Sequence, residues 1–234
     1  LLINGNSTLA RDSQMILRSL RLPPSVSLRA WFLPLPDKAE TWNIYVHELW
    51  PNADLTFFID GYAAVESRAL EQIALKLAEN PDAKCATGAP SHGRSARQLR
   101  QAMLNEGGIH GNLYALPRSS LEAIRENGFR LPKGIYRTDA TLGAALAFSF
   151  DPARFDWSAE RLLVVPEATW SIPATRWWTL AEWRGRWKRR IRQAQGDFEN
   201  LAVKKHLAID KQPAASLPST VRELVDNWLI KCPV

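Results

Sequence analysis

The chain has 234 residues, 46% of them hydrophobic, and its 30 Lys and Arg against 24 Asp and Glu give a formal net charge of +6 at pH 7. A chain of this length buries enough apolar surface to need neither disulfides nor a structural metal. Its two cysteines, Cys85 and Cys232, lack metal-binding spacing, so we expect free thiols in a reducing compartment. No run of about 18 consecutive apolar residues is present, so the sequence predicts no bilayer-spanning helix. Because the chain opens on Leu1 without an initiator Met or a signal peptide, we expect a cytoplasmic protein whose N-terminus is incomplete.

Predicted strands and helices alternate through the first three quarters of the chain. Short apolar or alternating runs predict the strands, and apolar residues at helical spacing predict the helices. In chain order we expect a strand at 1–3, a helix at 11–22, a strand at 26–33, a helix at 38–49, a strand at 55–59, a helix at 66–79, a strand at 83–88, helices at 95–106, 119–127 and 139–148, and a strand at 161–165. The run at 55–59 is continuous and apolar, as in a central parallel strand covered on both faces. The alternation predicts an α/β fold with a mostly parallel, doubly wound sheet flanked by helices.

The positive charge divides the chain into three predicted parts. Residues 1–171 hold 18 Lys and Arg and 18 Asp and Glu, so this predicted domain is neutral. Residues 172–211 hold 10 basic and 4 acidic residues, which accounts for the whole net charge of +6. Residues 212–234 are read as a Pro/Ala/Ser linker and a terminal helix at 219–230, in which the charges cancel. An anionic partner is therefore expected only at the middle part.

That basic part predicts an amphipathic helix. Its apolar residues step by three, four and four positions at Leu180, Trp183, Trp187 and Ile191, and basic residues fill the other faces. A Trp stripe beside a basic face is typical of a helix lying in the headgroup region of an anionic membrane. Two alternatives stay open: the stripe packs on the core while the basic face is solvated or reaches a diphosphate, or the segment binds nucleic acid. We do not expect nucleic acid, because the rest of the chain is neutral and carries no nucleic-acid-binding motif.

A carboxylate, Asp60, directly follows the predicted strand at 55–59 and precedes Gly61. Ligands of open α/β sheets bind at the carboxyl ends of strands, where Asp60 would meet a metal ion or a phosphate. The alternative is an ordinary Asp-Gly turn with no function.

The order and spacing of several short motifs between Leu1 and about Ala168 resemble the family-2 glycosyltransferases, which have the GT-A type of Rossmann-like fold. Five segments carry the resemblance: Leu1–Thr8 resembles the family's second strand and its nucleotide-facing turn, Asp37–Asn43 the segment that opens the next helix, Ala53–Tyr62 the strand ending in Asp-x-Asp, Gly111–Arg118 the acceptor-side strand, and Thr138–Leu142 the Glu-Asp-x-x-Leu motif.

The resemblance implies an enzyme that moves a sugar from a nucleoside-diphosphate sugar to a hydroxyl of a glycan or lipid-linked acceptor. It assigns the nucleotide and its phosphates to Asn4, Asn6, Lys38 and Asp60, with Arg189 and Arg190 of the basic helix. Asp60 is the implied ligand of Mn2+ or Mg2+, a Lewis acid on the leaving diphosphate. The implied acceptor side is Gly111, Asn112, Tyr114, Arg118 and Thr138, and Asp139 is the implied general base of an inverting reaction. The implied location is the cytoplasm, at the inner face of the inner membrane where the basic helix binds lipid.

Three departures from the family pattern keep other functions open. Tyr62 stands at the second Asp of Asp-x-Asp, Thr138 replaces the usual Glu beside Asp139, and the family's first strand is absent. The rival functions are a non-catalytic scaffold of the same shape and a sugar-phosphate nucleotidyltransferase.

The same residues also have ordinary structural readings. Asp139 is then a first-turn acid with Thr138 as the helix cap, Lys38 a solvated helix residue, and Asn4 and Asn6 turn residues.

Overall fold

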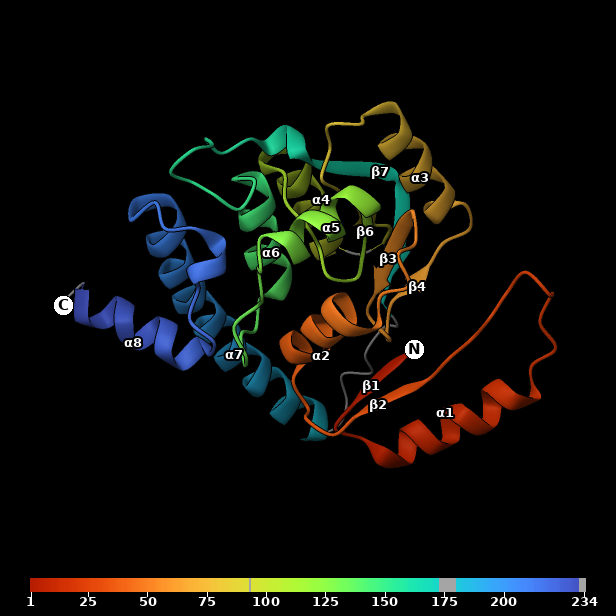
Figure 1. Ribbon diagram of the computed structural model, residues 1–234. Helices are drawn as coiled ribbons and strands as arrows, with labels where there is room; N and C mark the ends of the chain where they lie inside the picture. The colour runs from red at the N-terminus through yellow and green to blue at the C-terminus, as the bar shows by residue number, and fades with distance from the viewer. Residues whose placement is uncertain (93, 173–179, 232–234) are drawn as a thin grey trace.

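The described part of the protein folds as an α/β unit with two sheets (Figure 1). The computed structural model describes residues 1–92, 94–172 and 180–231, with the side chains of 94, 95, 180–186, 188, 189 and 231 left out. The larger sheet has five strands in the order β3-β6-β5-β7-β4, formed by Leu55–Ile59 (β3), Leu113–Pro117 (β6), Cys85–Pro90 (β5), Leu162–Ser171 (β7) and Ala64–Val65 (β4). This agrees with the predicted fold class of a sheet flanked by helices.

The prediction of a mostly parallel sheet is wrong in its strand pairing. β6 lies antiparallel between β3 and β5, with Ile59 opposite Leu113 and Ala86 opposite Ala115. β4 is antiparallel to β7, so within the described residues β5 and β7 form the only parallel pair of this sheet. Apolar patterning reports which faces of a strand are buried and carries no information on its direction.

The prediction that β3 is a central strand is also wrong. β3 lies at an edge of the five-strand sheet; Thr56 is buried, Leu55, Phe57 and Phe58 are partly buried, and Ile59 is exposed. The buried strands are β5, whose six residues are all buried, and β6. β5 is built from small residues (Cys-Ala-Thr-Gly-Ala-Pro), which do not produce the bulky apolar run expected of a central strand. Phe58 of this apolar run instead packs against the aromatic rings of Trp42 and Tyr45, in the helical segment that begins at Lys38.

Two apolar cores lie on opposite faces of the larger sheet. Along β6, Leu113 and Ala115 belong to one core, and Tyr114 and Leu116 to the other, as alternation in a strand requires. Helix α3 (Ala69–Glu79) covers the first face through Ile73. The second face is covered by α2 (Lys38–Ile44) with the π-helical turn Tyr45–Leu49 that continues it, by α5 (Arg118–Glu126) and by α6 (Thr138–Ala147). Helix α4 (Arg94–Glu106) contacts β5 and β7.

The C-terminal helices complete the second core. They are α7 (Leu180–Lys204), the π-helical turn Lys205–Ile209, and α8 (Val221–Lys231). Ala202, Val203, Leu207, Leu217 and Leu224 are buried and belong to the same core as side chains of α2, α5 and α6. The residues after 200 are therefore joined to the main apolar core.

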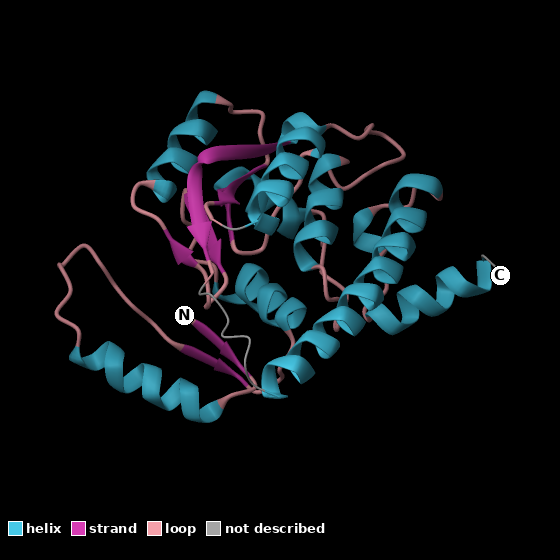
Figure 2. Cartoon of the chain, turned by 180° about the vertical axis from the view of Figure 1, so that it is seen from behind, coloured by secondary structure: helices cyan, strands magenta, loops and turns pink. Residues whose placement is uncertain are grey.

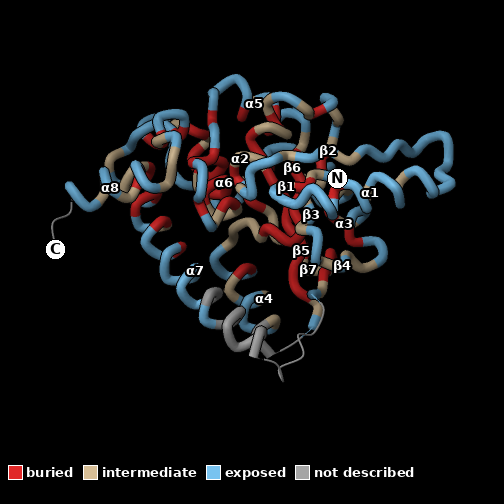
Figure 3. The backbone as a smooth tube through the Cα atoms, turned by 90° about the horizontal axis from the view of Figure 1, so that it is seen from below, coloured by how far each residue is buried: buried red, intermediate tan, exposed pale blue. Residues whose placement is uncertain are grey.

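The first 36 residues form a second, more exposed unit. Strands β1 (Leu2–Asn4) and β2 (Trp31–Leu33) pair in parallel, and α1 (Ser7–Ser19) connects them with the loop that follows it. Figure 2 shows this pair apart from the larger sheet, and Figure 3 shows α1 and its loop as mostly exposed chain. The strand predicted at 26–33 is reduced to its last three residues, because residues 26–30 find no strand partner.

Candidate functional site

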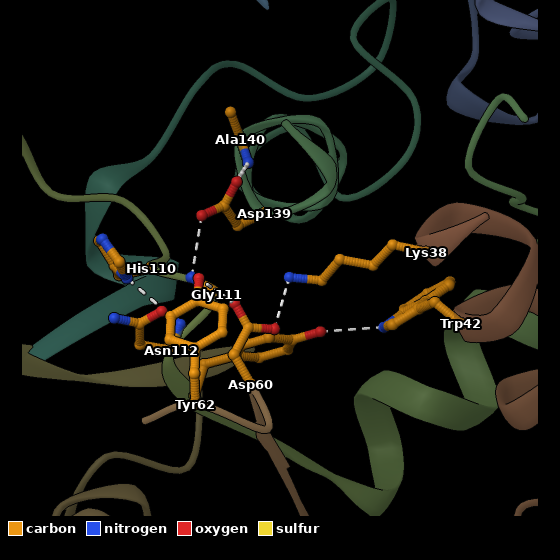
Figure 4. A network of polar contacts seen from close by, with 10 residues as sticks. Lys38, Trp42, Asp60, Tyr62, His110, Gly111, Asn112, Asp139 and Ala140 are labelled. Carbon is orange, nitrogen blue, oxygen red and sulfur yellow. Dashed lines mark hydrogen bonds and ion pairs between the residues drawn. The ribbon is translucent and has the colours of Figure 1, made fainter. Parts of the chain in front are cut away.

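The candidate site lies where β3 ends and three charged side chains meet. Asp60 follows β3 directly, and its Oδ1 accepts a hydrogen bond of 2.6 Å from Lys38 Nζ. Its Oδ2 accepts a hydrogen bond of 3.0 Å from the Tyr62 hydroxyl, two residues further on. Figure 4 shows both side chains and the contact between them. The Asp60 side chain is 17% exposed and that of Lys38 is 52% exposed, so the pair is reachable from solvent.

Lys38 owes its position to the way in which α2 is fastened. Asp37 caps the helix by accepting a hydrogen bond from Glu40 N at 3.0 Å, and its second oxygen accepts one from Gly134 N at 2.7 Å. One turn on, the buried Trp42 donates its indole N–H to the Tyr114 hydroxyl at 2.9 Å. The Tyr114 ring is stacked on Phe58 of β3 at 4.8 Å between centroids. The helix that presents Lys38 is thus tied to the strand that presents Asp60.

Asp139 reaches the same place from α6. It lies in the first turn of that helix, and its Oδ2 accepts a hydrogen bond of 2.8 Å from Gly111 N while Oδ1 accepts one of 3.0 Å from Ala140 N. The structural reading with Thr138 as the cap is wrong, because the N-cap residue is Arg137 and it makes no side-chain capping bond. The Asp139 carboxylate is instead tied to the loop before β6.

Gly111 marks the middle of this group, which we call the charged centre: Lys38, Asp60 and Asp139 around Gly111. A Cβ atom at Gly111 would lie 3.2 Å from Lys38 Nζ, 3.4 Å from Asp139 Oδ2 and 3.6 Å from Asp60 Oδ2. The charged atoms of α2, of α6 and of the residue that follows β3 therefore converge on one point that a side chain would fill.

His110 borders the charged centre, although it shows no metal-binding spacing in the sequence. Its ring packs on Trp170 at 4.6 Å between centroids, and its Nδ1 accepts a hydrogen bond of 3.2 Å from Asn112 N. Burial lowers the pKa of His110, and the charges of Asp139 and Asp60 oppose that shift. The sequence places His110 directly before Gly111. Only the structure shows that this position is next to the site, because Gly111 contacts Asp139.

The side chains of the charged centre do not fit a resident divalent cation at Asp60. The Lys38 ammonium already contacts Asp60, and Tyr62 adds a protonated hydroxyl where a second carboxylate would be needed. Partial burial and the charge of Asp60 raise the pKa of Tyr62 to about 12, so the hydroxyl stays a donor. Among the residues that the structure describes, no group of three His, Cys, Asp or Glu side chains is arranged to hold a metal ion.

Several predicted site residues are not brought to the charged centre. Tyr114 is a buried core residue, bonded to Trp42. Arg118 lies at the other end of β6, where it pairs with Asp54 at 2.8 Å. Asn6 caps α1 by accepting a hydrogen bond from Leu9 N at 2.9 Å, and Asn4 lies in β1. The turn that contains Asn4 and Asn6 is nevertheless near Lys38 in space, because Gly5 packs against Pro36, two residues before Lys38.

The remaining predicted residues lie beside the centre or on α7. Asn112 and Thr138 are buried next to Gly111 and Asp139 in sequence. Arg190 is exposed on α7, and the side chain of Arg189 lies outside the described residues. Of the predicted apolar stripe, Trp187 and Ile191 are each 63% exposed, so these two side chains do not pack on the core; the side chains of Leu180 and Trp183 lie outside the described residues. In the described part of the chain no helix is both long and apolar enough to span a bilayer.

Comparison with solved structures identifies the fold. The mannosyltransferase PcManGT from Pyrobaculum calidifontis, solved in complex with GDP-Man and Mn2+, matches 96% of this chain with a TM-score of 0.57 at 16% sequence identity. The chain spans 58% of the length of that protein. The protein therefore has the Rossmann-like α/β fold of a glycosyltransferase. No protein-family model matches the sequence, and neither does any curated protein.

Proposed function

We propose that the protein is a glycosyltransferase that moves a sugar from a nucleoside-diphosphate sugar to an acceptor hydroxyl with inversion. The observation that carries the proposal is the convergence of Lys38, Asp60 and Asp139 on Gly111 at the end of β3. Carboxylates and a cation that meet beyond the carboxyl end of a strand are placed where α/β folds bind phosphorylated ligands. The glycosyltransferase fold supports the same proposal, and the GDP-Man bound by PcManGT suggests the class of donor.

In this proposal Asp139 is the general base. Its two oxygens are oriented by the backbone N–H groups of Gly111 and Ala140, which leaves their remaining lone pairs for an acceptor hydroxyl. The acceptor oxygen attacks the anomeric carbon as its proton passes to Asp139. The bond between the anomeric carbon and the diphosphate breaks, and its electron pair stays on the diphosphate. Lys38 supplies positive charge for that leaving group.

We also propose that the acceptor is reached at an anionic membrane surface, through α7. This helix is anchored beside the base. Glu199 of α7 accepts a hydrogen bond from Tyr136 N at 2.7 Å, and Arg137, two residues before Asp139, pairs with Asp197 at 2.6 Å. Trp187, Arg190, Ile191 and Arg192 are exposed further along the same helix. Exposed aromatic and basic residues on one helix are what binding to anionic headgroups requires.

Two experiments test these proposals. Titration calorimetry with UDP-, GDP- and dTDP-sugars, followed by an assay of transfer or slow donor hydrolysis, is expected to show binding and turnover of at least one donor. A protein that binds none of them would be a scaffold rather than an enzyme.

Co-sedimentation with vesicles is expected to show binding to anionic lipid that falls as salt is added. Binding that ignores both lipid charge and salt contradicts the membrane proposal.

A further inference from the structure

The charged centre already contains a cation, the ammonium group of Lys38. It lies 2.6 Å from Asp60 Oδ1, and the point at Gly111 that is 3.2 Å from this nitrogen is also 3.4 Å from Asp139 Oδ2. A positive charge that contacts one carboxylate close to a second offsets part of their negative charge, as a metal ion bound there would.

The neighbouring groups favour the ammonium over a divalent ion. Asp60 gives one oxygen to Lys38 and the other to the Tyr62 hydroxyl. A metal ion at Asp60 would lie beside the Lys38 ammonium, which is 2.6 Å from Oδ1, and two positive charges at that separation repel each other. Tyr62 stands at the position of the second Asp of the Asp-x-Asp motif. It donates a hydrogen bond and supplies no negative charge.

Lys38 is also prepared for a second partner. An ammonium group has three donor hydrogens, and among the described residues only Asp60 accepts one of them, so two remain for phosphate oxygens. The side chain is 52% exposed, so a ligand reaches the ammonium without unfolding anything. The helix below it is fixed by Asp37 on Gly134 and by Asn43, which is bonded to both the N–H and the C=O of Leu131 at 2.9 Å.

We propose that Lys38 takes the place of a divalent cation in this protein, so that it binds the diphosphate of its donor and transfers the sugar without added metal. Asp60 and Tyr62 are the positioning residues that hold the ammonium in place. This inference rests on the proposed function and goes beyond it by assigning the positive charge to the chain itself. PcManGT, by contrast, was solved with Mn2+.

The first test compares donor binding with and without metal. Each of UDP-glucose, GDP-mannose and dTDP-glucose is titrated into the protein in EDTA and again in MnCl2. We expect the Kd of the donor that binds to agree within about twofold between the two buffers, since no charge is added by the metal. Binding at least tenfold tighter in Mn2+ would show that the carboxylates hold the ion and that Lys38 gives way, which overturns the inference and leaves the proposed function intact. Binding of none of the three in either buffer overturns both.

The second test uses variants. Lys38→Ala is expected to weaken donor binding in EDTA by about tenfold or more, the usual loss for a charge-assisted hydrogen bond. Lys76→Ala is the matched control, since Lys76 is a similarly exposed lysine on α3 paired with Glu79. Circular dichroism shows whether each variant is folded. Lys38→Ala with wild-type affinity in EDTA would contradict the inference.

The third test replaces Tyr62 with the carboxylate that the Asp-x-Asp motif has at this position. Tyr62→Asp supplies the second carboxylate and removes the hydroxyl donor, so donor binding is expected to become dependent on Mn2+. Tyr62→Phe removes only the hydroxyl and is expected to stay independent of metal. Metal-independent binding by Tyr62→Asp, together with Mn2+-dependent binding by the wild type, would be the opposite of what the inference requires.

Discussion

The two ends of β3 each carry an ion pair, and only one of them belongs to the site. At the first end Asp54 pairs with Arg118 at 2.8 Å, with the Asp54 side chain 95% exposed. At the second end Asp60 pairs with Lys38 at 2.6 Å, with the Asp60 side chain 17% exposed and bonded also to Tyr62. The pair geometry is similar, but Arg118 contacts one acid at the surface while Lys38 faces a second acid across Gly111. Convergence around a residue without a side chain distinguishes a site from a surface salt bridge.

The largest expected difference between the two ends concerns catalysis. Asp139→Asn removes the proton acceptor and keeps the shape of the side chain, so we expect turnover to fall by about 10²–10⁴-fold while donor binding is kept. Asp54→Asn is the matched change at the other end and is expected to leave turnover unchanged. Steady-state transfer assays decide the comparison, and equal activity in the two variants would remove Asp139 from the mechanism.

A second difference between the two ends of β3 is that Lys38, at the second end, is held in place by the buried hydrogen bond between Trp42 and Tyr114. Trp42→Phe removes the hydrogen bond to the buried Tyr114 hydroxyl and leaves that group unpaired, so the free energy of unfolding should fall by about 1–3 kcal/mol. Donor affinity should fall with it, because Trp42 fixes the helix that presents Lys38. Urea unfolding and donor titration measure the two effects. Unchanged stability would show that another contact fixes α2.

A smaller effect is expected from filling the point of convergence. Gly111→Ala places a methyl group 3.2 Å from Lys38 Nζ, and we expect the flexible lysine to move off Asp60. The predicted result is a loss of donor affinity of about tenfold with little change in stability, because the nearest atom is the end of a mobile side chain. Gly61→Ala is a suitable control, since no heavy atom lies within 4 Å of the Cβ that it adds. Wild-type affinity in Gly111→Ala would place the ligand elsewhere.

The smallest effect is expected at the surface pair. Arg118→Ala should change the free energy of unfolding by at most about 1 kcal/mol, because exposed ion pairs are weakened by solvent and by side-chain entropy. Turnover should be unaffected. If Arg118→Ala binds donor normally and loses transfer, Arg118 contributes to acceptor binding, as the resemblance implied.

The fold class and most of the elements follow from local residue patterns. Helical spacing located α2, α3, α4, α5 and α6 to within a few residues, and the apolar run Leu55–Ile59 has the bounds of β3. Asp60 was identified by its place after that strand, since ligand sites lie at strand ends whatever the rest of the chain does.

Tertiary structure decided how the elements pair and which residues meet. The central strands β5 and β6 are made of small or mixed residues, and the antiparallel course of β6 depends on partners far away in sequence. That course places Gly111 beside Asp60 and puts Arg118 at the opposite end, although both belong to one motif in the sequence. Lys38, Asp60 and Asp139 are separated by many residues and come from three elements. Their meeting depends on the packing of α2 and α6 against one face of the sheet, a long-range property that local residue patterns do not encode.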